Sequence, residues 1–274
     1  MDLYDSVSYE VSEKLTRSYT TSFGLSSRLF SRRIRPHIYA IYGLVRIADE
    51  VVDTYLGDDQ KNILDSVEAE TYRAIKRQYS PNPIINSFAK TAKIYGIDQS
   101  LIKPFFDSMR TDIGDGYNPD NYKEYIYGSA EVVGLMCLKV FCEGDSSRYT
   151  TLESGAKSLG SAYQKVNFLR DMKRDYEELG RLYFPGVNYK SFSSRAKRAI
   201  ENDISLDFIN AKVSINQLPI SSRLAVATSY SYYFALLDDI RSKSAQDIKS
   251  RRIRINNYRK LLIMFVTIIR LGKI

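Results

Sequence analysis

Two pairs of aspartates, each pair four residues apart in an apolar segment of helical period, constrain the fold of this chain more than any other feature. Asp49 and Asp53 follow one apolar run, and Asp171 and Asp175 follow another. Residues four apart lie on one face of an α-helix, so each pair sets two carboxylates side by side. Like charges at this spacing destabilise a helix by roughly 0.2–0.5 kcal/mol, which favours a bound cation. Acid pairs also occur on solvated helix faces, but these apolar surroundings favour two helices that face a shared, mostly buried site.

Apolar residues recur with helical period through most of the chain. Turn-forming residues interrupt the period at 57–59, 80–83, 114–119 and 180–188. No alternating strand pattern competes with it. The sequence therefore predicts an all-α, single-domain helical bundle with a central cavity between the two acid-bearing helices. The predicted helices cover residues 3–18, 36–55, 61–79, 84–95, 100–112, 121–142, 147–176, 196–216, 219–242 and 253–270.

Composition agrees with a single domain that spans residues 1–274. Hydrophobic residues make up 44% of the 274, which is enough for a substantial core. Seven Pro and fourteen Gly are few for this length, and no Ser/Gly-rich or Pro-rich linker divides the chain.

The net charge of +8, concentrated between Arg241 and Lys260, points to an anionic partner. Nucleic acid, anionic lipid and an anionic ligand all fit a basic surface. Nucleic acid is disfavoured because clustered acids repel phosphate unless a metal intervenes, and no nucleic-acid motif is present. We expect a diphosphate ligand and some contact with a membrane surface.

The apolar run 261–269 near the C-terminus is far shorter than the ~20 residues needed to cross a bilayer. With the basic residues just before it, this run fits either a peripheral membrane contact or a final helix of the core, and the core helix is favoured. The N-terminus lacks a basic start and an apolar signal run. The expected location is the cytoplasm, with peripheral contact at the inner membrane face. Protein partners stay unassigned.

The single histidine, His37, follows Pro36 at a predicted helix start. This position is typical of a surface or capping residue, so the predicted chemistry does not depend on histidine.

The segment Gln164–Pro185 resembles the signature of the squalene and phytoene synthase family. Shorter segments support the resemblance at 19–23, 41–46 and 127–134. The similarity extends over roughly residues 10 to 265, the scale of a whole domain, and is greatest to the bacterial phytoene synthases. It implies a helical bundle of the isoprenoid synthase type.

The resemblance implies a prenyltransferase that condenses two prenyl diphosphates head to head. For a phytoene synthase, two molecules of geranylgeranyl diphosphate form phytoene through prephytoene diphosphate, a cyclopropylcarbinyl diphosphate, in the first committed step of carotenoid biosynthesis. The alternative is an enzyme that makes squalene, dehydrosqualene or hydroxysqualene from farnesyl diphosphate. A non-catalytic assembly protein of the same fold is a weaker alternative, because both acid motifs are intact.

The resemblance also assigns roles to residues. The implied catalytic residues are Asp49, Asp53, Asp171 and Asp175, which with Asn167 would hold Mg²⁺, or Mn²⁺ in its place. No NAD(P)H is expected. Arg46 and Arg170 are candidates for gripping diphosphate oxygens, because guanidinium pairs with phosphate; ion pairs with neighbouring carboxylates are the alternative. The implied substrate-binding residues are Thr20, Ser22, Tyr42, Arg46, Gln164, Arg170 and Tyr233.

Three features bear on how closely the family pattern applies. Thr21 stands where some relatives carry a basic residue, and Glu131 adds a carboxylate in the middle segment. Glu131 would face solvent, pair with an arginine or alter the pocket. The loop 180–185 either closes over bound diphosphate or simply connects two helices.

Overall fold

The computed structural model describes residues 2–55, 57–113 and 118–271, and no strand occurs in these ranges. The predicted all-α fold is therefore confirmed. A π-helical turn, η3 (Tyr127–Glu131), joins α7 to α8, and short 3₁₀ turns form η1 (Ser27–Leu29) and η2 (Pro119–Asn121). The α-helices are α1 (Leu3–Tyr19), α2 (Ser22–Ser26), α3 (Arg35–Asp53), α4 (Gln60–Arg77), α5 (Pro83–Tyr95), α6 (Gln99–Thr111), α7 (Tyr122–Ile126), α8 (Val132–Cys142), α9 (Ser146–Glu177), α10 (Ser194–Gln217), α11 (Ile220–Arg241), α12 (Ala245–Ser250) and α13 (Asn257–Leu271).

Local chemistry explains many of the helix ends. Side-chain oxygens accept hydrogen bonds from first-turn N–H groups at several helix starts, and each such cap stabilises a helix by about 1 kcal/mol. Gly96 ends α5 with φ of 65°, a conformation that glycine adopts without strain. The capping residues are Asp2, Asn82, Asp98, Asp145, Ser193 and Ser244.

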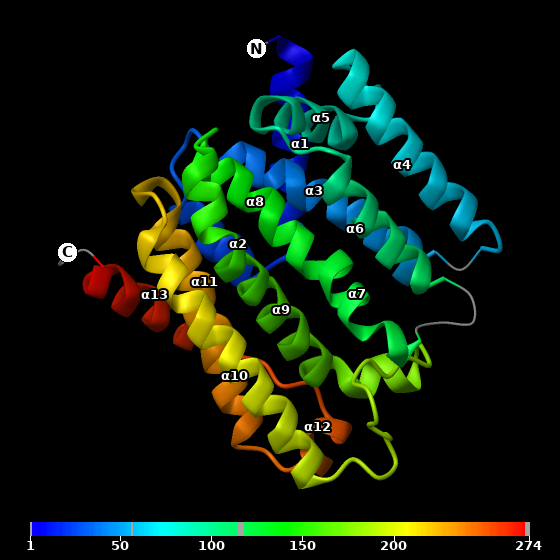
Figure 1. Ribbon diagram of the computed structural model, residues 1–274, viewed down its shortest axis with the longest axis vertical. Helices are drawn as coiled ribbons and strands as arrows, with labels where there is room; N and C mark the ends of the chain where they lie inside the picture. The colour runs from blue at the N-terminus through cyan, green and yellow to red at the C-terminus, as the bar shows by residue number, and fades with distance from the viewer. Residues whose placement is uncertain (1, 56, 114–117, 272–274) are drawn as a thin grey trace.

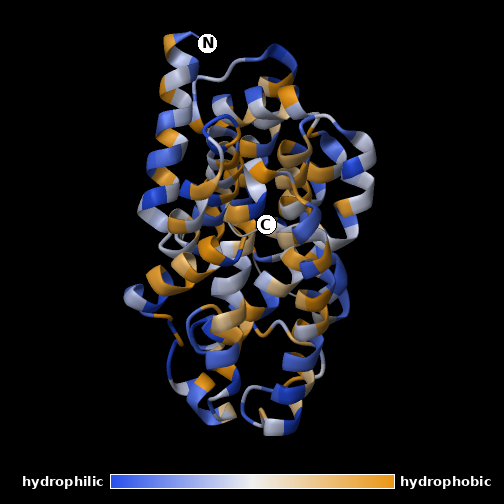
Figure 2. Ribbon diagram, turned by 90° about the vertical axis from the view of Figure 1, so that its left-hand side faces the viewer, coloured by the Kyte–Doolittle hydropathy of each residue, from blue (hydrophilic) through white to orange (hydrophobic). Residues whose placement is uncertain are grey.

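The long helix α9 runs through the middle of the molecule and packs against α8, α10 and η3 (Figure 1). α3 packs against α1 and α5, and α11 lies between α10 and α13. Buried side chains form two apolar clusters, one among α3, α5, α6 and α8 and the other among α9, α10 and α11. Figure 2 shows that apolar residues gather in the middle of the molecule, where the helices pack.

Most helix boundaries lie within one or two residues of the predicted ones. The segment 121–142 contains the π turn instead of a continuous α-helix, and the short helices α2 and α12 were not predicted. The predicted break at 114–119 falls largely on residues 114–117, which lie outside the described residues.

The prediction for the C-terminal helix was wrong in two respects. α13 begins at Asn257, four residues later than predicted, and residues 252–256 are not helical. Ile253 and Ile255 are buried there while Arg252 and Arg254 are exposed, the alternation of an extended segment. α13 is also not a core helix: only Lys260 and Thr267 of its residues are buried, and its large apolar side chains are either exposed or half-buried.

The prediction for His37 was wrong as well, because its ring is buried. Its Nδ1 lies 2.9 Å from Thr91 Oγ1 and 3.2 Å from the Tyr9 hydroxyl oxygen. Packing of α3 against α1 and α5 encloses the first turn of α3. The side chain is therefore a polar contact among three helices.

Two glycines allow α6, η3 and α9 to approach closely. A Cβ on Gly128 would lie 2.4 Å from the carbonyl oxygen of Pro104, and one on Gly160 would lie 2.7 Å from that of Ala130. Within the described residues, Tyr122–Cys142 is the one helical run long and apolar enough for a membrane span, and 56% of its most apolar window is buried inside the protein.

Candidate active site

A cavity of about 1020 Å³ lies between α2, α3, α8, α9 and α11, with the segment before α13 at its edge. This volume is at the upper end of ligand sites, which run to roughly 1,000 Å³. Every site residue that the sequence suggested lines it. These residues are Thr20, Ser22, Tyr42, Arg46, Asp49, Asp53, Gln164, Asn167, Arg170, Asp171, Asp175 and Tyr233.

The first acid pair lies on α3. Asp49 is surrounded by protein yet faces the cavity, and burial followed by the charge of Asp53 raises its pKa to about 7. Asp53 accepts a hydrogen bond from Arg181, whose Nη1 lies 3.1 Å from Asp53 Oδ1. In the α3 pair, therefore, burial opposes ionisation of Asp49, whereas Asp53 is ionised and paired with an arginine.

The second acid pair lies on α9 and has the same asymmetry. Asp171 forms ion pairs with Arg170 and with Arg252, whose Nε lies 2.7 Å from Asp171 Oδ1. Burial and then the charge of Asp171 raise the pKa of Asp175 to about 7, and Asp53 on the other helix contributes in the same direction. The two acid pairs are therefore close enough to influence one another electrostatically.

The donor set suits a hard divalent cation. Carboxylates from two helices line one cavity, and the side-chain oxygen Oδ1 of Asn167 is buried there without a hydrogen-bond partner. Mg²⁺ is usually held by one or two carboxylates together with phosphate oxygens of a substrate. In the described part of the chain, no group of three or more His, Cys, Asp or Glu side chains lies close enough to hold a metal by itself. The residues fit a metal that binds together with an anionic ligand.

Both arginines of the sequence analysis line the cavity and also contact acids. Arg46 pairs with Glu50 one turn along α3, and its guanidinium carbon lies 4.2 Å from the centroid of the Tyr19 ring. Arg170 donates from Nε to Asp171 at 3.1 Å. Both arginines therefore form ion pairs with neighbouring carboxylates, and both also line the cavity.

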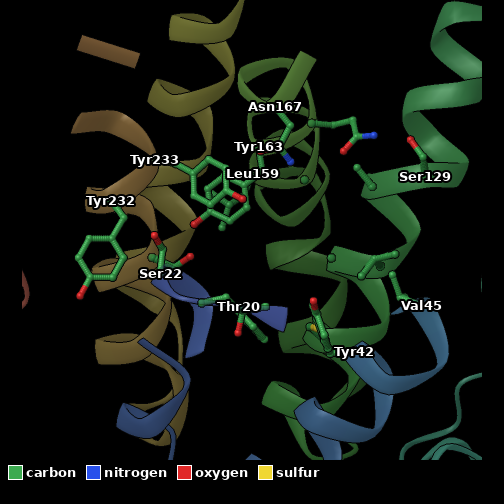
Figure 3. A pocket seen from close by; sticks show the side chains of 18 of the residues that line it. Thr20, Ser22, Tyr42, Val45, Ser129, Leu159, Tyr163, Asn167, Tyr232 and Tyr233 are labelled. Atoms are coloured by element: carbon green, nitrogen blue, oxygen red, sulfur yellow. The ribbon is translucent and has the colours of Figure 1, made fainter. Parts of the chain in front are cut away.

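Polar groups from the end of α1 and from α2, α3 and α11 also line the cavity. Figure 3 shows Thr20 and Ser22 on one side and Tyr42 on another. Burial raises the pKa of Tyr42 to about 12, so this hydroxyl stays protonated at neutral pH. Tyr233 stacks on Tyr163 with ring centroids 3.9 Å apart, which fixes both rings at the cavity wall.

The rest of the cavity is lined mainly by apolar and small side chains. Phe30 and Phe141 stack on each other, with centroids 5.4 Å apart, and both line the cavity. Small side chains on α8, η3 and α9 leave room beside them. These are Ser129, Ala130, Gly134, Ala156 and Gly160, so the small residues both line the cavity and let helices approach.

Further charged residues that line the cavity were not predicted as site residues, among them Asp112, Arg181, Arg252 and Lys260. Lys260 on α13 donates from Nζ to Thr21 Oγ1 at 2.7 Å. A basic group therefore does reach the position where Thr21 replaces the basic residue of some relatives. Its one sequence signal was the cluster of basic residues before the apolar C-terminal run.

Arg181 ties the loop after α9 to the first acid pair. Besides Asp53, it donates from Nη2 to the carbonyl oxygen of Asp112 at 2.7 Å. Asp112 in turn accepts from the Tyr125 hydroxyl at 2.7 Å, and burial raises its pKa to about 6. The loop 180–185 is thus more than a connection, because one of its side chains reaches into the cavity wall.

Glu131 lies away from the main cavity. It lines a separate pocket of about 360 Å³ together with Lys157, Ser161 and Asp207. Burial raises its pKa, and Lys157 opposes this effect. Its charged neighbours are Lys157, Lys165 and Asp207, so no arginine is among them, and its half-buried side chain lines this separate pocket and not the main cavity.

Comparison with known proteins agrees with this geometry. The family model described as squalene/phytoene synthase matches residues 16–259. The chain is 24% identical to a 4,4'-diapophytoene synthase of Staphylococcus haemolyticus, over 89% of this chain and 90% of that protein. It is 28% identical to a phytoene synthase of Mycobacterium tuberculosis, over 65% of this chain and 57% of that protein.

Among solved structures, that of a dehydrosqualene synthase in complex with ligand superposes with a TM-score of 0.83. It shares 20% sequence identity and 98% coverage of both chains, which supports the fold. The family model covers most of the chain, including both acid motifs. The chain belongs to the squalene/phytoene synthase family.

Proposed function

We propose that this protein condenses two molecules of geranylgeranyl diphosphate head to head, giving phytoene through prephytoene diphosphate. One observation carries the proposal: two aspartate pairs on facing helices sit at the polar end of a single large cavity whose remainder is mainly apolar. A prenyl diphosphate has the same division, a charged head and a long apolar chain. Family membership supports a condensation of this general type.

The polar end would hold and release the diphosphate. Asp49, Asp53, Asp171, Asp175 and Asn167 would hold Mg²⁺, which supplies charge neutralisation for the leaving diphosphate when bound. Arg46 and Arg170 would bind phosphate oxygens once the ligand competes with their present carboxylate partners. Thr20, Ser22 and Gln164 would donate or accept further hydrogen bonds around the head groups.

The apolar end would orient the chains and exclude water. Loss of the first diphosphate leaves an allylic cation, which the double bond of the second substrate attacks with loss of a proton. Loss of the second diphosphate, rearrangement and loss of another proton complete phytoene. This sequence consumes no reductant, so we propose that no nicotinamide cofactor takes part. Aromatic rings such as Tyr163 and Tyr233 line the cavity and would stabilise a carbocation held beside them.

A C30 synthase is the second candidate, and a specific similarity favours it. The relative from Staphylococcus haemolyticus, matched over nearly its whole length, is named for diapophytoene. Such an enzyme would use farnesyl diphosphate and the same polar end, and would differ in the depth of the apolar end. A non-catalytic role is less supported, because all four aspartates are present and line the cavity.

The test is incubation of purified protein with Mg²⁺ and either farnesyl or geranylgeranyl diphosphate, without and with NADPH. The hydrocarbon is identified by mass, and protein stripped of metal with EDTA is the control. A C40 product without reductant supports phytoene synthesis. A C30 product moves the assignment to the farnesyl branch, and no product from either substrate contradicts both.

A further inference from the structure

The helix α13 exposes a stripe of large apolar side chains to solvent, while most of its other apolar side chains are half-buried against the protein. The exposed residues are spaced three or four apart, which places them on one face of the helix. Exposed fractions are high for side chains of this size: 79% for Tyr258, 49% for Leu261, 50% for Leu262, 61% for Phe265 and 42% for Ile269. A contiguous apolar stripe on a surface marks an interaction site more often than isolated exposed residues do.

Polar contacts hold the opposite side of α13 on the body of the protein. Lys260 is 7% exposed and bonds to Thr21, and Thr267 Oγ1 lies 3.3 Å from Ser231 Oγ on α11. Arg259 donates from Nη1 to Asp239 Oδ1 at 2.6 Å. These contacts fix the rotation of the helix about its axis, so the apolar stripe cannot turn inward without breaking them.

Positive charge accompanies the stripe. Arg251, Arg252 and Arg254 are exposed in the segment that leads into α13, and Arg270 is exposed near its end. An apolar helix face flanked by basic residues is typical of helices that lie in the interface of an anionic bilayer. A second protein copy would have to match this charge with acids, whereas the chain as a whole carries +8.

We propose that α13 seats this protein on an anionic lipid bilayer. The stripe Tyr258, Leu261, Leu262, Phe265 and Ile269 enters the acyl boundary. Arg251 and Arg270, which are exposed and do not line the cavity, contact lipid phosphates. α13 lies on the left of Figure 1, and in Figure 2 that side faces the viewer with the C-terminus in the middle of the face. The same face carries the segment 252–260, six residues of which line the cavity. The surface proposal stands whether or not the chain condenses prenyl diphosphates.

The test is flotation of the purified full chain with vesicles of phosphatidylcholine containing phosphatidylglycerol. Phe265→Glu places a charge at the centre of the stripe, and we expect at least a tenfold weaker partition. Ile94→Glu is the matched control, since Ile94 is also 61% exposed but lies on α5. We expect the control to float like the wild type, and both variants to melt at the wild-type temperature because neither side chain is buried.

A charge variant separates lipid charge from apolar insertion. Arg251 is exposed and does not line the cavity. Arg251→Glu should weaken binding to the anionic vesicles by about fivefold or more and leave binding to pure phosphatidylcholine vesicles unchanged. Equal flotation of Phe265→Glu and Ile94→Glu would overturn the proposal. So would a wild type that does not float but forms a dimer in light scattering that Phe265→Glu abolishes, because the stripe would then belong to a second copy.

Discussion

At the scale of single residues, the four aspartates of the site divide by their partners. Asp53 and Asp171 are ion-paired with arginines, whereas Asp49 and Asp175 have pKa values raised to about 7 by burial and by the neighbouring acid. A group whose pKa lies near 7 responds strongly to a cation placed beside it. In each pair, therefore, one carboxylate must exchange its arginine partner for the metal, and the other must be deprotonated before it binds the metal.

Asp171→Asn removes one of these carboxylates with little change in shape. We expect turnover to fall by about a hundredfold or more, the scale of a single electrostatic group at a reacting centre. The fold should survive, because the amide still accepts a hydrogen bond from Arg252. Rates of diphosphate release, with circular dichroism on the same samples, measure both effects. Glu153→Gln changes a surface acid on the same helix and should stay within about twofold of wild type. Wild-type turnover in Asp171→Asn would remove the metal role.

His37 gives a pH dependence of the opposite kind from Asp49 and Asp175. Burial lowers its pKa from 6.5 to about 4, so between these values the unfolded chain binds more protons than the folded one. Stability from this group is complete above pH 6.5 and falls as the pH drops, by up to about 3 kcal/mol. The pKa values of Asp49 and Asp175 are raised, so these two groups stabilise the folded protein more as the pH falls over part of the same range. Only a comparison of two proteins that differ at His37 therefore isolates the effect of the histidine.

The difference to measure is between the wild type and His37→Gln, which keeps a polar group near Thr91 but cannot take a charge. Urea unfolding at several pH values should show the wild type losing its advantage over the variant as the pH falls from 7 to 4. A constant difference across that range would show that the ring titrates normally.

The sequence identified the acids and one of their partners, Arg170, but not the partners that come from distant segments. A spacing of four on one helix is visible in a single chain, and it marked Asp49, Asp53, Asp171 and Asp175. Arg181, Arg252 and Lys260 reach the same cavity from a loop and from the C-terminal segment, and no spacing relates them to the acids. His37 was misplaced because its burial depends on how α1 and α5 cover the start of α3.

At the scale of elements, the π turn η3 fixes how α6 and α9 approach. Gly128 lies against Pro104 and Ser108, where an added Cβ would come within 2.4 Å of a backbone oxygen and 2.7 Å of Ser108 Cβ. Backbone cannot move aside as a flexible side chain can. The absence of a side chain at this position is therefore a packing requirement.

Gly128→Ala should lower the free energy of unfolding by about 1–3 kcal/mol, the usual cost of overpacking, despite the better helix propensity of alanine. Denaturant unfolding measures the loss. Gly134→Ala is the graded comparison, since its Cβ would meet the Ala156 oxygen at 3.0 Å. We expect that variant to lose less, and the reverse order would contradict the packing argument.

The helical period of the sequence located most of the long helices well, because within each of them apolar residues recur at the spacing that places them on one face. It failed for α2 and α12, which have five and six residues and are too short to show a period. It also failed for the C-terminal segment, where the alternation of Ile253 and Ile255 with arginines belongs to extended chain. The apolar run 261–269 was predicted either to contact a membrane or to close the core, with the core favoured, because an apolar pattern alone does not say which of the two a helix faces.

At the scale of the whole molecule, the cavity is built from parts that are distant in sequence, and its polar end contains both signs of charge. Asp53, Asp112 and Asp171 lie beside Arg181, Arg170 and Arg252. A bare cation meets arginines there, and a bare anion meets carboxylates. A metal and a diphosphate that arrive together satisfy both sets, since the metal takes the acids and the phosphate takes the arginines.

This arrangement predicts that metal and diphosphate stabilise the protein cooperatively. Mg²⁺ alone and inorganic diphosphate alone should each change the melting temperature little. Together, at about a hundred times their joint dissociation constant, they should add about 2.7 kcal/mol, or several degrees. Differential scanning fluorimetry with the four combinations of ligand measures this directly. Asp171→Asn should lose most of the joint shift, because one acid of the metal set is gone while the arginines remain. A full shift with Mg²⁺ alone would mean that the acids bind metal without help from phosphate, and that their pairing with arginines does not oppose it.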